Sequence, residues 1–167
     1  VRVDYNVPHD KDGHILDDRR IRATIPTIRY LLDHGAAVVL ASHMGRPKGA
    51  VVKDLSLAPA AKRLSEILNQ EVLFSDDCVG EKASAMKKSL KPGQVLLLEN
   101  LRFHREEEKN DPAFAKALAD GCDLAVNDAF GVSHRTHASV VGVGRLMPMV
   151  SGLLLKKEID FLDGVIE

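Results

Sequence analysis

The sequence contains no tryptophan, and aromatic residues make up only 4% of its 167 residues. It also has no apolar run near the roughly 20 residues that a membrane-spanning helix needs, and no pattern typical of a secretory leader. We therefore expect neither a membrane span nor a leader, and a cytoplasmic location. The net charge of -1 argues against general attraction to nucleic acid or to a membrane surface, so any anion site must be local.

Cysteine is also scarce, with only Cys78 and Cys122, which lie far apart and form no CxxC pair. We expect two buried free thiols in a reducing compartment. Common phosphate and nucleophile motifs are missing as well. There is no GxxxxGK[ST] loop, "GVGRLMP" lacks the third glycine of GxGxxG, and no GxSxG occurs. The histidines of "HRTH" are three residues apart without an obvious third ligand, so we expect no metal site.

Short apolar runs alternate with amphipathic segments along the whole chain. The runs predict strands over 1–5, 36–42, 71–74, 94–100 and 122–130. Helical spacing predicts helices over 21–32, 57–68, 79–90, 111–121 and 155–166, and a short helix interrupted by glycines over 138–148. This alternation indicates an α/β fold, a Rossmann-like parallel sheet between helix layers, with residues 1–167 as one domain.

Ligands of such sheets bind beyond the carboxyl ends of the strands. Basic residues follow three expected strands there, namely Arg46, Arg102 and Arg135. Because the planar guanidinium matches phosphate and carboxylate oxygens, their convergence predicts an anion site. Asp4 and Asn6 follow the first strand and suit a hydroxyl group. Together these residues indicate a small phosphorylated hydroxy acid as ligand. The acidic run "REEEKND" at 105–111 is expected to be a solvated surface.

Several segments match a known family in the same order. They are "RVDYNVP", "RIRATIPTI", "SHMGRPKG", "SLAPAAKRLSEIL", "LLLENLRFH", "NDAFGVSHRTHAS" and "SGLLLKKEIDFL". These segments resemble the amino-terminal half of the phosphoglycerate kinase family, and they cover essentially the whole chain. The departures are Tyr5, Met44 and the pair Val132–Ser133, where the family often has other residues; none replaces a charged contact.

The resemblance implies a two-domain kinase of glycolysis. This enzyme moves a phosphoryl group reversibly between 1,3-bisphosphoglycerate and ADP, giving 3-phosphoglycerate and ATP. Residues 1–167 would be the substrate-binding domain, with 151–167 the start of the interdomain helix. The nucleotide-binding domain, which would hold Mg-ADP or Mg-ATP, would be absent, so this part alone is expected to be an inactive monomer without a cofactor. We also expect the final helix, with Leu155, Ile159, Leu162 and Ile166 on one face, to pack back on the domain.

Site residues follow from the same resemblance. Asp4 and Asn6 would hold the substrate hydroxyl, and Arg20 would reach the transferred phosphoryl group as the catalytic residue. A basic patch would surround the substrate phosphate, with Gly45 keeping its turn compact. The implied substrate-binding residues are Asp4, Tyr5, Asn6, Arg20, His43, Met44, Gly45, Arg46, Arg102, His134 and Arg135. No general base is needed, because the attacking group is the substrate's own ionised carboxylate.

Two other functions remain open at this point. One is a stand-alone sugar-phosphate-binding module without catalysis, which the length of the natural protein would distinguish from a kinase. The other is a receiver-like signalling domain, another small α/β protein with aspartates at strand ends. That domain needs an acidic pair after the first strand, whereas here the pair Asp76–Asp77 follows the third.

Overall fold

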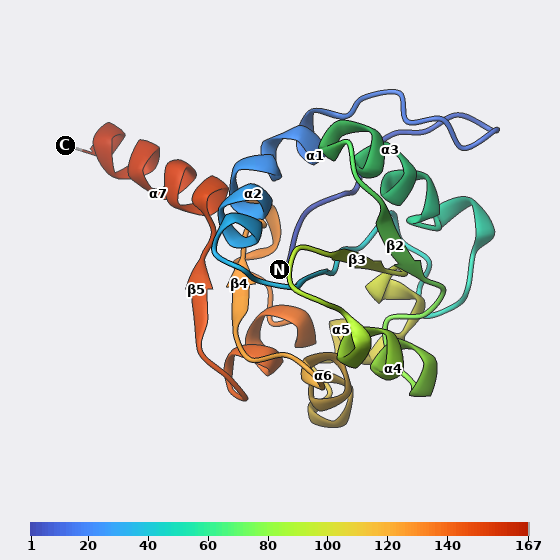
Figure 1. The fold of residues 1–167 in the computed structure, drawn as a ribbon. Coiled ribbons are helices and arrows are strands. Elements are labelled where there is room, and N and C mark those ends of the chain that lie inside the picture. The colour runs from blue at the N-terminus through green and yellow to red at the C-terminus, as the bar shows by residue number, and fades with distance from the viewer. Residues whose placement is uncertain (167) are drawn as a thin grey trace.

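The computed structural model describes residues 1–166, which form a parallel sheet covered on both faces by helices (Figure 1). Three strands lie in the order β1 (Val38–Leu40), β3 (Val95–Leu98) and β2 (Val72–Ser75), with both pairings parallel. A second parallel pair joins β4 (Ala125–Asn127) to β5 (Met149–Ser151). The expected parallel α/β architecture is therefore confirmed.

The first residues of the chain connect these two groups of strands. The backbone of Arg2 pairs in parallel with both Ala41 and Asn127. The Val3 N–H donates to the Ala41 carbonyl at 3.0 Å, and the Arg2 N–H donates to the Val126 carbonyl at 2.8 Å. The sheet is thus continuous, and the segment 1–3 lies at its centre between β1 and β4.

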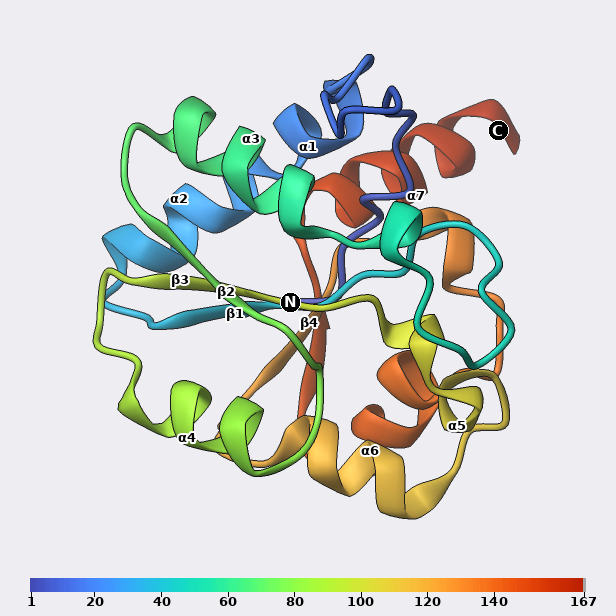
Figure 2. The same ribbon diagram turned by 90° about the vertical axis from the view of Figure 1, so that its right-hand side faces the viewer.

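The helices divide into two layers, which Figure 2 shows above and below the sheet. One layer holds α1 (Arg19–Ala23), α2 (Ile25–Asp33), α3 (Ala58–Leu68) and the start of α7 (Leu153–Ile166), and the other holds α4 (Glu81–Ser89), α5 (Arg105–Glu108) and α6 (Pro112–Ala119). None of the helices within residues 1–166 is long and apolar enough to cross a membrane.

Both faces of the sheet are buried, which explains the continuous apolar runs in its strands. In β3, Val95 and Leu97 join an apolar cluster beneath α2 and α3, and Leu96 and Leu98 join a second cluster beneath α6. All four side chains are fully or almost fully buried. The free thiols differ from expectation, because Cys78 is buried but Cys122 is only partly so.

Two predicted helices are wrong in detail. The helix expected over 21–32 is split at Thr24, and α2 restarts with Pro26 in its first turn, where the missing N–H of proline has no cost. The helix expected over 138–148 is present but shorter, since a π-helical turn over Ala138–Gly142 continues as helix only through residues 143–144. The unpredicted strand β5 follows it.

The prediction that α7 packs back on the domain holds only for its first turn. Leu155 is 6% exposed, but Ile159, Leu162 and Ile166 are 39%, 43% and 83% exposed. Figure 1 shows α7 projecting from the body of the molecule. Its first turn is fixed by Asp128, whose Oδ1 accepts the N–H groups of residues 154 and 155 at 3.0 and 3.1 Å.

Candidate functional site

Loops that follow the central strands surround a cavity of about 670 Å³, which we call the basic pocket. Its walls come from the loops after the segment 1–3, after β1, after β3 and after β4, together with α1. The lining residues are Asp4, Asn6, Arg20, His43, Gly45, Arg46, Lys48, Arg102, Glu108, Gly131, Val132 and Arg135. The loops at the carboxyl ends of these strands therefore meet at one site, as is typical of parallel sheets.

Eight of the eleven predicted substrate-binding residues line the basic pocket. Tyr5, Met44 and His134 do not. Tyr5 is fully buried and its hydroxyl lies 2.7 Å from the Thr24 hydroxyl, because side chains alternate along extended backbone and its neighbours Asp4 and Asn6 point the other way. The Met44 side chain is in the core, and His134 is exposed outside the cavity.

Asp4, Asn6 and Arg20 form a polar cluster at one side of the basic pocket. Arg20 Nη1 lies 3.3 Å from both carboxylate oxygens of Asp4 and donates to the Asn6 carbonyl at 3.0 Å. The Asn6 side-chain oxygen accepts the Gly45 N–H at 3.0 Å. The side chain of Arg20 remains 57% exposed. The cluster thus presents a carboxylate, an amide and an accessible guanidinium to a ligand.

Gly45 is required by the backbone of the loop after β1. Its φ of +61° is in the left-handed region, and a Cβ there would lie 2.8 Å from Leu55 Cδ2. A larger residue would therefore be strained in this backbone conformation, and the end of the Leu55 side chain would have to move.

The basic pocket has a net positive charge, because its cationic side chains outnumber its carboxylates. Its lining has five cationic side chains and two carboxylates. The side chains of Arg46, Lys48 and Arg135 make no hydrogen bond or ion pair with any residue in the range 1–166. Arg102 is 9% exposed, and its Nε lies 3.4 Å from Glu108 Oε1. Burial lowers the pKa of Arg102. These groups can bind a small ligand with several negative charges.

His43 contributes a neutral ring to this wall of cations. Burial is the main reason that its pKa falls to about 2, and the nearby charges of Arg2 and Arg102 lower it further. At physiological pH the imidazole is therefore uncharged and carries one N–H donor.

Sequence reasoning missed four residues of the pocket, Lys48, Glu108, Gly131 and Val132. Lys48 follows Arg46 by two positions in the same loop, which was a usable signal. The expectation of a solvated acidic run at 105–111 is wrong for Glu107, whereas Glu108 is exposed as expected. Glu107 is fully buried, with its Oε1 accepting the Ser139 N–H at 2.7 Å, and Glu108 lines the basic pocket. Both placements depend on the position of α5 against the sheet, which the local sequence does not encode.

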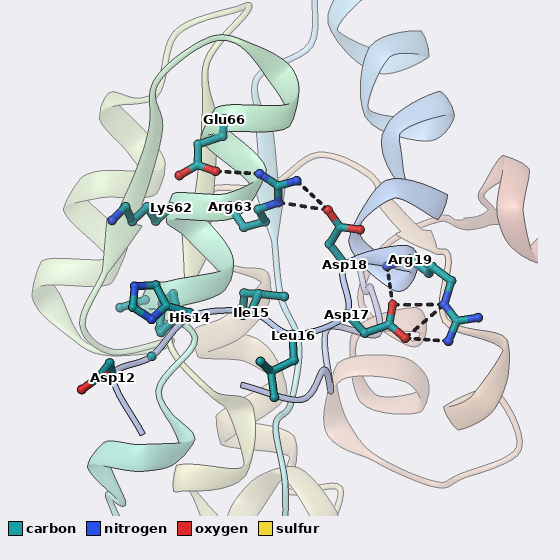
Figure 3. Close-up of a pocket in the computed structure, with 13 residues that line it drawn as sticks. Asp12, His14, Ile15, Leu16, Asp17, Asp18, Arg19, Lys62, Arg63 and Glu66 are labelled. Atoms are coloured by element: carbon teal, nitrogen blue, oxygen red, sulfur yellow. Dashed lines mark hydrogen bonds and ion pairs between the residues drawn. The ribbon is translucent and has the colours of Figure 1, made fainter. Parts of the chain in front are cut away.

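A second cavity of about 840 Å³ lies between α3 and the loop that leads into α1 (Figure 3). Its charged side chains are mostly paired with one another. Arg63 binds Asp18 Oδ2 at 2.8 Å and Glu66 Oε2 at 2.7 Å, and Arg19 binds Asp17 Oδ2 at 2.6 Å. We call this space the second cavity; it offers a ligand little uncompensated charge.

Groups that could ligate a metal lie elsewhere. Within residues 1–166, two sets of three potential ligands are close together: Asp77 with Cys78 and His104, and Asp10 with Asp12 and His14. In the first set, His104 Nε2 is already 2.7 Å from Asp77 Oδ1. Neither set lines the basic pocket.

Known proteins share both the sequence and the fold. The family model described as "Phosphoglycerate kinase" matches residues 1–167. A phosphoglycerate kinase of Desulforapulum autotrophicum is 58% identical over 100% of this chain and 43% of its own length. That of Gloeothece citriformis is 57% identical over 100% of this chain and 42% of its own length. The chain thus spans less than half the length of these relatives.

Solved structures agree with the sequence matches. The phosphoglycerate kinase of Pyrococcus horikoshii OT3 superimposes with a TM-score of 0.85 and 43% identity, over 95% of this chain and 40% of that protein. That of Coxiella burnetii gives a TM-score of 0.84 and 38% identity, over 97% and 40%. The family model, the relatives and the fold lead to one conclusion: the chain belongs to the phosphoglycerate kinase family.

Proposed function

We propose that the protein containing this chain is a phosphoglycerate kinase, and that residues 1–167 bind 3-phosphoglycerate or 1,3-bisphosphoglycerate in the basic pocket. The observation that carries the proposal is the set of unpaired cations, Arg46, Lys48 and Arg135, at one cavity built from strand ends. A phosphate and a carboxylate together carry about three negative charges, which suits this excess of positive charge.

Each part of the substrate has a counterpart in the pocket. Arg46, Arg102 and Arg135, with the N–H of His43, would bind the phosphate oxygens. The Asp4 carboxylate would accept a hydrogen bond from the substrate hydroxyl, and the Asn6 amide would donate one to it. This division keeps the Asp4 carboxylate away from the phosphate of the ligand.

Arg20 is the proposed catalytic residue. It is exposed beside Asp4 and Asn6, so its guanidinium can reach a phosphoryl group placed at the carboxylate end of the substrate. Phosphoryl transfer depends mainly on positioning and on neutralising charge. The attacking group in the reverse direction is the substrate carboxylate, so the pocket needs no general base.

The nucleotide would be bound outside these residues, as Mg-ADP or Mg-ATP. Residues 151–167 would begin the helix that leads to that second domain, since α7 leaves the domain surface with Ile159, Leu162 and Ile166 uncovered. We further propose that the whole enzyme is a cytoplasmic monomer and that residues 1–167 alone are inactive.

Two measurements test the proposal. Titration of the isotope-labelled chain with 3-phosphoglycerate should shift the NMR signals of Arg46, Arg102 and Arg135; shifts confined to the opposite edge of the sheet would refute the site.

A coupled assay of residues 1–167 with ADP and 1,3-bisphosphoglycerate should show no transfer, because lost positioning alone removes roughly 7–11 kcal/mol of catalysis. Activity near that of a two-domain kinase would contradict the proposal that the nucleotide is bound outside residues 1–167. A natural protein with no second domain would instead favour a stand-alone binding module.

A further inference from the structure

Arg2 is a buried arginine that lies directly behind the basic pocket without lining it. It is 4% exposed and sits in the central segment of the sheet. Its Nε donates to Ser139 Oγ at 2.9 Å, and one terminal nitrogen donates to the Val3 carbonyl. The other terminal nitrogen lies 3.0 Å from His43 Nδ1. Arginine is rarely buried unless it has specific partners, and one of the partners of Arg2 is the ring of His43.

The contact between Arg2 and His43 determines which ring nitrogen carries the proton. A guanidinium has only donors, so His43 Nδ1 must accept and cannot be protonated. The single proton of the neutral ring is then on Nε2. His43 Nε2 forms no hydrogen bond with any residue in 1–166 and is not one of the buried unpaired polar atoms. His43 lines the basic pocket, so Nε2–H is the ring donor that remains available to a ligand there.

We propose that Arg2 is a positioning residue that holds His43 in the Nε2–H tautomer and aims this N–H at the anion in the basic pocket. The inference rests on the proposed function for the identity of that anion. Arg2 therefore acts on the ligand through His43. Its direct role is to provide the donor that Nδ1 requires.

Arg2 is itself held in place from the opposite side. The buried Glu107 accepts the Ser139 N–H at 2.7 Å, and Ser139 accepts from Arg2 Nε. Burial lowers the pKa of Arg2 to about 10, and the charges of Glu107 and Asp4 oppose that change. Arg2 therefore stays charged at neutral pH. The π-helical turn that begins at Ala138 presents Ser139 to both partners, and such turns are frequent at functional sites.

The pKa of His43 depends on its burial and on the charged groups around it. Burial is the largest cause of its lowered pKa, followed by Arg2, Arg102, His137 and Arg20, all in the same direction. A ring that stays neutral between pH 5 and 8 is thus expected in the unaltered chain. Removal of Arg2 would take away one cation and the only donor to Nδ1 among residues 1–166, so the ring would gain a proton more easily.

The test is nitrogen NMR of the histidine-labelled chain without ligand, followed by titration with 3-phosphoglycerate. In the unaltered chain His43 should show a protonated Nε2 and an unprotonated Nδ1, with no titration between pH 5 and 8. In the Arg2→Met variant, the His43 ring should lose its fixed tautomer or titrate between pH 5 and 8. The variant should also bind 3-phosphoglycerate about tenfold to hundredfold more weakly at pH 8, which is the contribution of a hydrogen bond to a charged group. Arg2→Lys, which keeps a charged donor, should retain both properties.

Arg29→Met is the matched control, since Arg29 is exposed on α2 and should change neither property. A ring protonated on Nδ1, or one that titrates near pH 6 in the unaltered chain, would overturn the proposal. So would an Arg2→Met variant that melts earlier but keeps the ring signals and the affinity of the folded chain. If Arg2→Met does not fold, the unaltered chain and Arg2→Lys still decide the tautomer. The expected ring signals without any 3-phosphoglycerate binding would support the Arg2–His43 contact and refute the proposed function.

Discussion

Two cavities of this chain, the basic pocket and the second cavity, differ more in charge pairing than in size. The second cavity is larger, at about 840 Å³, but its arginines are bound by Asp17, Asp18 and Glu66. The basic pocket, at about 670 Å³, leaves Arg46 and Arg135 without partners among residues 1–166. Cation–carboxylate pairs satisfy each other, so they attract a ligand weakly, whereas unpaired cations are available to bind one. The unpaired cations make the basic pocket the better candidate for an anion site, although its volume is smaller.

Arg19 and Arg20 show the same contrast within one helix. They are adjacent in α1, yet Arg19 binds Asp17 beside the second cavity and Arg20 turns to Asp4 in the basic pocket. Both are exposed and both have one acidic partner. Only Arg20 lines the basic pocket, so a difference between their variants reports the contribution of that pocket.

The largest expected effect is on turnover. In the proposed two-domain enzyme, Arg20→Ala should lower kcat by about 10³, the size of an arginine contribution to phosphoryl transfer. Arg19→Ala should leave kcat unchanged. Neither change should shift the melting temperature much, because exposed ion pairs contribute little. Steady-state kinetics and thermal melts measure both quantities. An Arg20→Ala variant that unfolds but turns over normally per folded molecule would make Arg20 structural.

The next effect is on affinity. Arg46→Ala should weaken 3-phosphoglycerate binding by about tenfold to hundredfold, because it removes charge-assisted hydrogen bonds to the phosphate. Lys62→Ala, which removes an exposed cation of the second cavity, should not change the affinity. Isothermal titration of both variants gives the comparison. Equal losses would mean that the charge of the whole domain, and not the pocket, binds the ligand.

A smaller effect should come from salt. Raising the ionic strength from about 0.01 M to 0.15 M shortens the screening length from about 30 Å to 8 Å. Binding of 3-phosphoglycerate should weaken several-fold over this range. The dependence should be shallower in Arg46→Ala and unaltered in Lys62→Ala. Salt-independent binding would argue against an electrostatic pocket.

The smallest effect concerns stability at the second cavity. Contacts with Arg63 and Arg22 lower the pKa of Asp18 below its ordinary value near 3.9. A carboxyl whose pKa is lowered by folding stabilises the fold above its ordinary pKa, and this contribution is lost as the pH falls through the lowered value. Asp18→Asn should therefore lower the melting temperature slightly at pH 7, and the difference should narrow towards pH 3. Asp12→Asn, at an exposed residue of the same cavity, should show neither change.

The buried strands could be predicted from sequence because burial on both faces leaves an uninterrupted apolar run, as in β3. The strand β5 could not be predicted from the sequence in this way. It has three residues at the edge of the sheet, Val150 is 48% exposed, and neither an apolar run nor alternation marks it. The break at Thr24 was indicated by Pro26, but the apolar spacing across it favoured one helix.

The pocket was partly predictable for a similar reason. Arg46, Arg102 and Arg135 follow strands, and parallel strands bring their carboxyl ends together. Tyr5 and Glu107 could not be assigned locally. The first is turned into the core by the alternation of extended backbone, and the second is buried only when α5 docks near Ser139. Alternation does place Arg2 on the same side as Asp4, which was an unused signal for its role.

The central position of residues 1–3 has a consequence for the order of assembly during synthesis. This segment pairs with Ala41 on one side and with Asn127 on the other, so the sheet cannot close until β4 has been made. Pairings distant along the chain are slow to form, because the intervening loop must first be closed. During synthesis, the segments that form β1, β2 and β3 therefore leave the ribosome before those that form β4 and β5. Until then, Asp4 and Asn6 lack the loop that carries Arg135, and the basic pocket of the nascent chain is incomplete.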